Sequence, residues 1–259
     1  MTVCITAFSD DDDKIVAVCD RLLSGDIHSI EASATKIVRF CGTWVSCYAG
    51  DPSHAQTVLT SAATRLASEP EAEAVVEAFR NAYSEHRIAC IEQEKLSAFG
   101  MNMKTFLSEG LANLGETIFE RVFEEVRCFY LNLAFLIAGW GKRNDTMDWE
   151  MFTIENPGAV KRHSIIGTHA IGEGAHLALG HMYATYEKYS SIQETAYRAL
   201  EAKFIAEATR SVGPATLGYV LSKNGAFDAI PYADIDAMHK RWTEKRRQLD
   251  PEIARIISV

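Results

Sequence analysis

The chain has 259 residues, of which 47% are hydrophobic, and it carries a formal net charge of −9 at pH 7. This length and apolar content suffice for a full hydrophobic core, so we expect one domain over residues 1–259. The negative charge argues against nucleic acid as a partner, because nucleic-acid binding depends on neutralising phosphates.

Two short apolar segments near the start of the chain predict a β-hairpin. Residues 3–8 and 15–19 are rich in apolar and β-branched side chains, and the polar segment 9–14 between them is typical of a turn. Four consecutive aspartates at 10–13 raise the alternative of a cation site, but a solvated turn is favoured because they lie between two paired strands. The pairing places Asp20, which ends the second strand, beside Thr2.

A second strand pair is predicted at residues 35–40 and 43–49, after a turn at 24–26. Lys36 stands at the start of this pair and faces an apolar interior, so it needs a partner of opposite charge, and Asp20 is the natural one. Gly50 ends the pair directly before Asp51, which with the proline and serine that follow it signals the start of a helix.

Hydrophobic periodicity predicts that strands and helices alternate in blocks along the rest of the chain. Helices are expected at 52–67, 70–94, 116–127, 174–189, 192–211 and 233–249, and strands at 129–138, 149–154, 164–171 and 216–221. This order gives an α+β fold with two sheets covered on both outer sides. The polar, glycine-punctuated stretch 98–110 belongs to an enlarged helical region at about 92–128, for which a loop over a substrate entrance, a subunit contact and a surface excursion all stay open.

Thr2 is a candidate nucleophile once Met1 is removed. Its hydroxyl and a free α-amino group, with an ordinary pKa of about 7.7–8.0, would then share one residue. Such an amine can take the hydroxyl proton directly or through one water. A nearby Lys36 cation would lower the pKa of the amine, and the backbone N–H of Gly50 could stabilise an oxyanion. The alternatives are a structural Asp20–Lys36 ion pair and a tight turn at Gly50.

Several short segments together resemble the proteasome β-subunit family, including its bacterial proteasome-like peptidases. The steps of sixteen residues from Asp20 to Lys36 and of fourteen from Lys36 to Gly50 are those of that family. The segments that carry the resemblance are 2–8, 15–21, 35–37, 48–50 and 135–140.

This resemblance implies a four-layer αββα sandwich of the N-terminal-nucleophile hydrolase type and a threonine endopeptidase that needs no cofactor. It makes Thr2 the nucleophile, Asp20 and Lys36 its charged partners, and Gly50 the oxyanion donor. It also implies a peptide or unfolded protein as substrate, assembly into a homo-oligomeric ring and an ATPase as a partner.

Two departures from the family pattern concern the surroundings of Thr2. Glu173, between two glycines, stands where the family has a serine, and its charge would raise the pKa of the terminal amine. The family's later Asp-x-x-Ser motif is present only in part, because Ala208 replaces the aspartate while Ser211 is kept; Glu207 lies one position away. A peptidase with altered pH dependence, a slow enzyme and an inactive one all remain open.

The family's specificity-pocket positions correspond to Leu23, Ala34, Tyr48 and Pro52. A bulky Tyr48 at the pocket base predicts a preference for small or medium side chains before the scissile bond. Two other functions are kept as alternatives. One is a noncatalytic ring subunit of the same fold, and the other is an N-terminal-nucleophile amidase that acts on a small amide.

A cytoplasmic location is expected, with no role at a membrane. The first fourteen residues contain four aspartates and no basic segment, unlike a secretory signal, and the most apolar run, 128–140, is too short to span a bilayer. The six cysteines include no Cys-x-x-Cys pair and are expected to be reduced. No metal site is expected either, because His176 and His181 are five residues apart and diverge on a helix.

Overall fold

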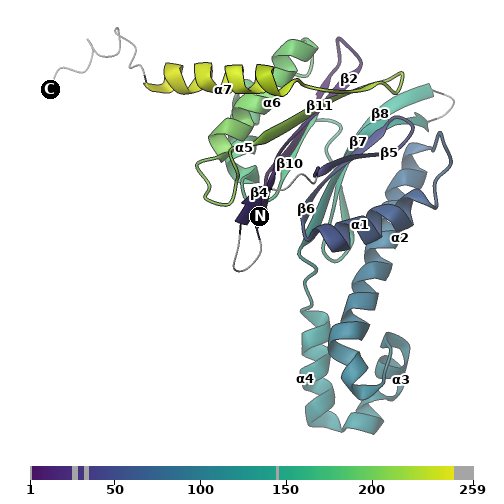
Figure 1. The fold of residues 1–259 in the computed structure, drawn as a ribbon. Coiled ribbons are helices and arrows are strands. Elements are labelled where there is room, and N and C mark those ends of the chain that lie inside the picture. Colours follow the sequence, from purple (N-terminus) through teal and green to yellow (C-terminus); the bar gives the residue numbers. More distant parts are fainter. Residues whose placement is uncertain (1, 25–28, 32–34, 144–145, 248–259) are drawn as a thin grey trace.

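The computed structural model describes residues 2–24, 29–31, 35–143 and 146–247. The chain has a mixed α+β fold in which two antiparallel sheets are combined with helices (Figure 1).

The first sheet contains the predicted N-terminal hairpin. Its strands, in spatial order, are β10 (Thr168–Ile171), β1 (Cys4–Ser9), β2 (Lys14–Asp20), β11 (Thr216–Ser222) and β12 (Phe227–Ala229). Side chains alternate along β1, so that Ile5 and Ala7 join one hydrophobic cluster while Cys4 and Phe8 join another. Both faces of this strand are therefore buried.

The second sheet faces the first. Its strands, in spatial order, are β5 (Ile37–Cys41), β6 (Trp44–Gly50), β7 (Leu133–Arg143), β8 (Thr146–Glu155) and β9 (Ala159–Arg162). A shared core joins the two sheets. In it the ring of Phe8 stacks on Trp149, with 4.1 Å between centroids, and meets Trp140 edge to face.

Helices pack on the outer face of each sheet. Against the first sheet lie α5 (Ala175–Thr185) and α6 (Ile192–Ala206), with α7 (Tyr232–Arg247) beside α6. Against the second sheet lie α1 (Pro52–Ala63) and α2 (Ala72–Ile91). The start of α1 is fixed locally, because the Asp51 side chain accepts a hydrogen bond of 2.7 Å from the backbone N–H of Ser53.

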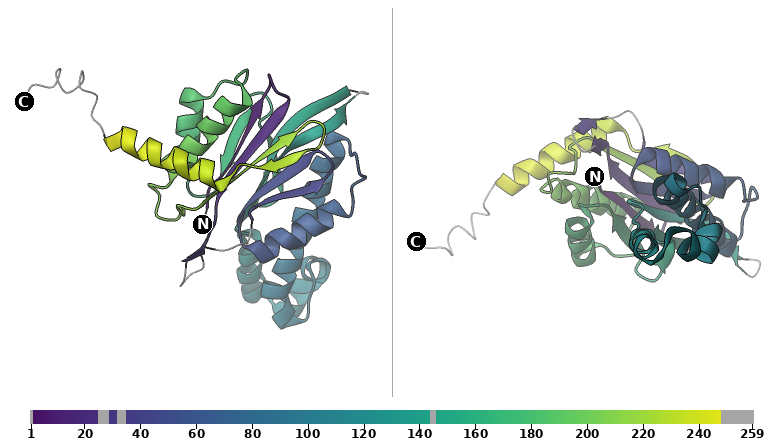
Figure 2. Two further views of the ribbon diagram at one scale, coloured as in Figure 1. Left: turned by 45° about the horizontal axis from the view of Figure 1, so that its top comes forward. Right: turned by 90° about the horizontal axis from the view of Figure 1, so that it is seen from below.

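A helical extension leaves the body beyond α2 (Figures 1 and 2). It comprises a π-helical turn at Glu92–Leu96, a 3₁₀ turn at Ser97–Phe99, α3 (Met103–Leu114) and α4 (Glu116–Arg127). Its own small core contains Ile91, Leu96, Phe106, Val122 and Val126.

Several predicted boundaries were wrong. No separate helix was predicted in the stretch 98–110 of the enlarged helical region, yet α3 starts within it, because Asn102 caps the helix through the backbone N–H of Thr105. The strand expected at 164–171 is confined to 168–171, and the helix expected at 192–211 ends at Ala206. The short strands β9, β12, β3 (Leu22–Ser24) and β4 (Ser29–Glu31) were not predicted. Of the last predicted helix, residues 248 and 249 lie outside the described residues.

Candidate active site

The hairpin of β1 and β2 brings Thr2 and Asp20 together. In the register of this hairpin Cys4 lies opposite Cys19, so the next residues outward, Val3 and Asp20, lie side by side. The backbone N–H of Asp20 donates to Val3 O at 3.2 Å, and Val3 N–H donates to Asp20 Oδ1 at 2.9 Å. The Thr2 hydroxyl donates a hydrogen bond to the same Oδ1 atom. Both side chains are buried.

Lys36 completes this group from the residue just before β5. Its ammonium donates to Asp20 Oδ1 at 3.1 Å, to Leu22 O at 2.6 Å and to the Thr2 hydroxyl. An ammonium has three N–H groups, and each of them has an acceptor here. Lys36 is only 3% exposed, so its position is fixed by these contacts and by the surrounding core.

The Asp20 carboxylate has further donors that offset the cost of burying its charge. The backbone N–H of Leu22 lies 3.0 Å from Oδ2, and that of Gly213 lies 3.3 Å from the same oxygen. A buried ion pair is tolerated when its remaining polar atoms are also satisfied, and this pair meets that condition. The geometry can hold a hydroxyl between a fixed cation and a fixed carboxylate.

Gly50 ends β6 in a conformation that favours glycine. Its φ is +122°, and a Cβ atom at this position would come within 2.1 Å of Asn132 O. Gly50 and Thr2 both line one pocket of about 320 Å³. The backbone of Gly50 is therefore placed at the same pocket as the Thr2 hydroxyl.

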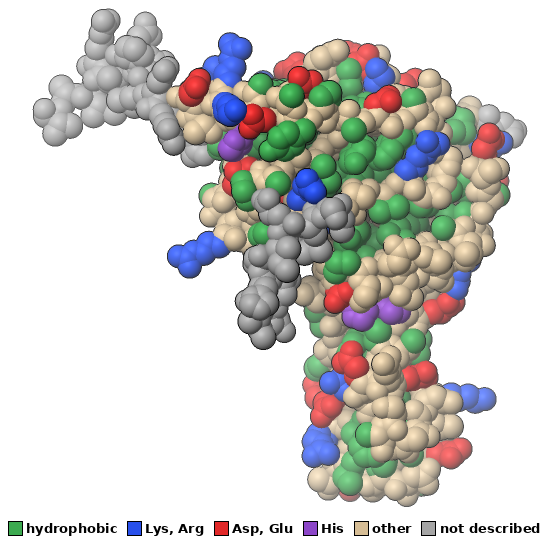
Figure 3. All heavy atoms as spheres, in the orientation of Figure 1, with side chains coloured by type: hydrophobic (Ala, Val, Ile, Leu, Met, Phe, Trp, Pro, Cys, Tyr) green, Lys and Arg blue, Asp and Glu red, His purple; other side chains and the backbone are tan. Residues whose placement is uncertain are grey.

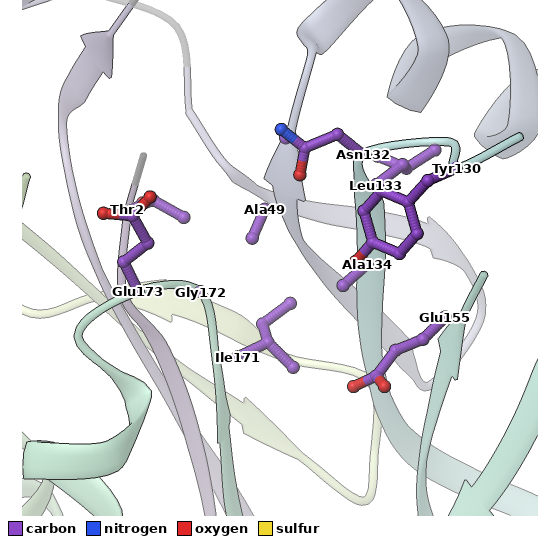
Figure 4. A pocket seen from close by; sticks show the side chains of 11 residues that line it. Thr2, Ala49, Tyr130, Asn132, Leu133, Ala134, Glu155, Ile171, Gly172 and Glu173 are labelled. Carbon is purple, nitrogen blue, oxygen red and sulfur yellow. The ribbon is translucent and has the colours of Figure 1, made fainter. Parts of the chain in front are cut away.

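Figure 4 shows the two sides of this pocket. Thr2 and Glu173 lie on one side, while Tyr130 and Asn132, from the segment before β7, lie on the other with Glu155 from the end of β8. Ala49 and Ile171 lie between them. Sequence reasoning missed Tyr130, Asn132 and Glu155, because no motif marks them and only the fold brings them to Thr2.

The loop 172–174 wraps around the backbone of Thr2. Gly172 has a φ of +93°, and a Cβ there would approach Thr2 O to 2.2 Å, while Gly174 N–H donates to this oxygen at 3.3 Å. Glu173, between them, is exposed and extends toward Thr2 (Figure 4). The predicted proximity of Glu173 to the candidate nucleophile is thus observed.

Ser211 lies near the site without joining it through a hydrogen bond. It is 9% exposed, and its hydroxyl has no hydrogen-bond partner among the described residues. Two residues later, the backbone N–H of Gly213 donates to Asp20, so the loop that carries Ser211 contacts Thr2 through Asp20.

Lys203 is a buried cation that sequence reasoning missed. Its ammonium lies 2.6 Å from Glu207 Oε1 and donates to Pro214 O at 2.9 Å, next to Gly213. Burial lowers the pKa of Lys203, and the Glu207 carboxylate opposes this shift. The i, i+4 spacing of Lys203 on α6 and Glu207 at its C-terminal cap was the available signal.

Of the four predicted specificity residues, Tyr48 and Pro52 do not line the described pocket. Pro52 is the first residue of α1, and Tyr48 is buried in the cluster that joins the second sheet to α1 and α2. Burial raises the pKa of Tyr48. Leu23 lies on β3, and Ala34 lies outside the described residues. The predicted preference for small or medium side chains stays a prediction.

His176 and His181, which were considered for a metal, have separate partners. Nδ1 of His176 lies 2.9 Å from Glu173 O, and Nε2 of His181 lies 3.0 Å from Glu201 Oε2.

Comparison with known proteins assigns no family to the chain, because no protein-family model and no curated protein matches it. Over the ranges that the structure describes, no helix combines the length and the apolar character needed to cross a membrane.

Proposed function

We propose that the chain is a threonine-type peptidase whose nucleophile is Thr2, exposed by removal of Met1. One observation carries the proposal: the Thr2 hydroxyl donates to Asp20 and accepts from Lys36, beside a pocket that Gly50 also lines. A solvated surface threonine needs no such pair of buried charges. The resemblance to proteasome β-subunits, with the same residues at the same spacing, supports the proposal independently of the contacts.

In the proposed reaction Thr2 Oγ attacks the carbonyl carbon of a peptide bond. The hydroxyl proton passes to the free α-amino group of Thr2, and the Lys36 cation stabilises the negative charge that develops on Oγ. The carbonyl oxygen becomes an oxyanion that the Gly50 N–H stabilises. The protonated α-amino group then gives its proton to the leaving amine, and the C–N bond breaks to leave an ester on Thr2. Water hydrolyses this ester and restores the hydroxyl.

The roles of the charged partners follow from their contacts. Asp20 holds Lys36 at 3.1 Å and accepts from three backbone N–H groups, so it fixes the position of the cation. A preorganised cation needs no reorganisation when charge appears on Oγ. Asp20 is therefore proposed as a positioning residue and Lys36 as a catalytic one.

The proposal extends to fold and assembly. Sheets that share a core, with α5 and α6 outside one and α1 and α2 outside the other, support a four-layer αββα sandwich of the N-terminal-nucleophile type.

Exposed Leu107 and Leu111 on α3 support contacts between subunits of a homo-oligomeric ring. An ATPase partner that delivers unfolded protein rests on the resemblance alone. Six unpaired cysteines suit the reducing cytoplasm.

Peptide hydrolysis by correctly trimmed protein tests the proposal. Intact mass spectrometry first verifies that Met1 has been removed, and fluorogenic peptides then compare the wild type with Thr2→Ala and Thr2→Ser. We expect hydrolysis by the wild type, retained activity in T2S and none in T2A. A trimmed, folded wild type that cleaves no peptide would favour the noncatalytic ring subunit, and cleavage of small amides alone would favour the amidase.

A further inference from the structure

Two histidines and a cysteine converge where α1 meets α2, away from the pocket of Thr2. His54 Nδ1 lies 3.0 Å from His86 Nε2, and Cys90 Sγ lies 3.6 Å from the same nitrogen. One ring nitrogen from each histidine and the cysteine sulfur all lie within 4.8 Å of one another. Histidine side chains reach the surface beside the base of the helical extension in Figure 3.

The helices hold these side chains in place. His86 and Cys90 are four residues apart on α2, so both project from one face of it. His54 lies in the first turn of α1, directly after the Asp51 cap. The two helices pack through a common core that includes Ala55, Val58 and Val76, which fixes the two elements relative to each other.

We propose that His54 Nδ1, His86 Nε2 and Cys90 Sγ form a site for Zn²⁺, with water as the fourth ligand. Imidazole nitrogen and thiolate sulfur are ligands that Zn²⁺ prefers, and three protein ligands with one open position are a known arrangement for it.

The observed separations are close to those of a tetrahedral centre. Zn–N bonds of about 2.0–2.1 Å and a Zn–S bond of about 2.3 Å give ligand separations of about 3.3 Å for two nitrogens and about 3.6 Å for nitrogen and sulfur. The pairs that include His86 stand at 3.0 Å and 3.6 Å. The third separation, from a His54 ring nitrogen to Cys90 Sγ, is at most 4.8 Å, a limit that includes the tetrahedral value.

Access and charge both suit a cation. His54 and His86 are half-buried, which leaves an ion a path from solvent, whereas Cys90 is 7% exposed. Two carboxylates contribute negative charge: Asp51 interacts electrostatically with His54, and Glu94 with Cys90. As the Zn–S bond forms, the Cys90 thiol releases its proton to solvent, and the ion loses a water for each ligand it gains.

The competing interpretation is a hydrogen bond between two imidazoles with no metal. In that case one ring nitrogen carries a proton and the other accepts it, and Cys90 contributes only its contact with His86 as a protonated thiol. The two interpretations differ in the role of Cys90, which the experiment therefore targets.

The test uses the full chain, stripped with a chelator and titrated with Zn²⁺ or Co²⁺. We expect one Zn²⁺ per chain by calorimetry and by elemental analysis after desalting, and a higher melting temperature with added Zn²⁺. Co²⁺ should give a thiolate-to-metal charge-transfer band in the near ultraviolet. C90S should abolish this band, and C90S, H86A and H54A should each weaken Zn²⁺ binding by at least about tenfold, since even the loss of a ligand's hydrogen-bond partner costs this much.

The matched controls are C128S, which removes an exposed cysteine at the end of α4, and H176A, which removes an exposed histidine. Both should bind Zn²⁺ like the wild type, and so should T2A, which separates this site from the proposed peptidase. Circular dichroism checks that each variant is folded. Failure of the stripped protein to bind Zn²⁺ stoichiometrically, or wild-type binding by folded C90S and H86A, would overturn the proposal.

Discussion

Lys36 and Asp20 form a buried ion pair, 3.1 Å from Nζ to Oδ1, and the Thr2 hydroxyl is hydrogen-bonded to both partners. Asp20 ends β2 of the first sheet, and Lys36 directly precedes β5 of the second, yet neither side chain is more than 3% exposed. Burial makes this pair costly unless every polar atom is satisfied, and the backbone N–H groups of Val3, Leu22 and Gly213 supply the remaining donors.

Replacing Lys36 by methionine should lower both stability and activity. The change leaves the Asp20 charge buried without its cation, and breaking a buried pair in this way typically costs about 3–5 kcal/mol. The measurement is the free energy of unfolding in urea. The control is Lys142→Met, whose partner Glu69 is 3.4 Å away at the surface, because exposed pairs contribute about 0–1 kcal/mol. Equal losses of unfolding free energy in K36M and K142M would contradict this expectation.

Gly50→Ala should destabilise the protein more than Gly100→Ala. Both glycines have positive φ, +122° and +65°, so both substitutions strain the backbone. A Cβ at Gly50 also meets Asn132 O at 2.1 Å, whereas nothing lies within 4 Å at Gly100. We expect an additional cost of about 1–3 kcal/mol for G50A, the usual range for overpacking. Thermal unfolding of the two variants provides the comparison, and similar melting temperatures would count against the clash.

Glu173→Gln should shift the acidic limb of the pH–activity profile to lower pH. The α-amino group of Thr2 acts as a base only when it is unprotonated. Nearby Asp20 and Glu173 favour its charged form and raise its pKa, while Lys36 lowers it. Removing one carboxylate therefore lowers the amine pKa, by less than about one unit because Glu173 is exposed to solvent.

The profile of kcat/KM against pH measures this shift, because it reports groups of the free enzyme. Glu109→Gln, an exposed substitution on α3, is the control and should leave the profile unchanged. A shift of the acidic limb of the E173Q profile to higher pH would show that Glu173 does not raise the pKa of the Thr2 amine.

Ser211→Ala should separate activity from stability. The Ser211 hydroxyl is buried and has no hydrogen-bond partner among the described residues, so its removal should change the free energy of unfolding by no more than about 1 kcal/mol. We expect its functional partner to be the α-amino group that Met1 removal creates. The trimmed S211A protein should then lose about tenfold in kcat/KM, on the scale of one hydrogen bond. Unchanged kcat/KM would remove Ser211 from the site.

Local patterns were sufficient to predict the core of the site. Alternating apolar residues on both sides of an acidic turn predicted the hairpin that joins Thr2 to Asp20, because strand register follows from turn position and from side-chain period. The burial of Lys36 then left Asp20 as its partner. The positive φ of Gly50 and the close approach of Asn132 required the folded chain.

Features that depend on distant segments could not be predicted. α3 begins in a polar stretch, and its cap and the contact of Phe106 with α4 residues compensate for the weak local pattern. Glu155 reaches the pocket through the pairing of β7 and β8, and Tyr130 reaches it from the segment before β7. His54 and His86 are 32 residues apart on two helices, and neither carries a motif.

Covalent labelling of the trimmed protein by a β-lactone, followed by peptide mapping in the mass spectrometer, identifies the nucleophile directly. We expect one acyl group per chain, attached to Thr2 as an ester, with labelling lost in T2A and strongly reduced in K36M. An acyl group on any other residue, or undiminished labelling of T2A, would contradict the assignment of Thr2 as the nucleophile.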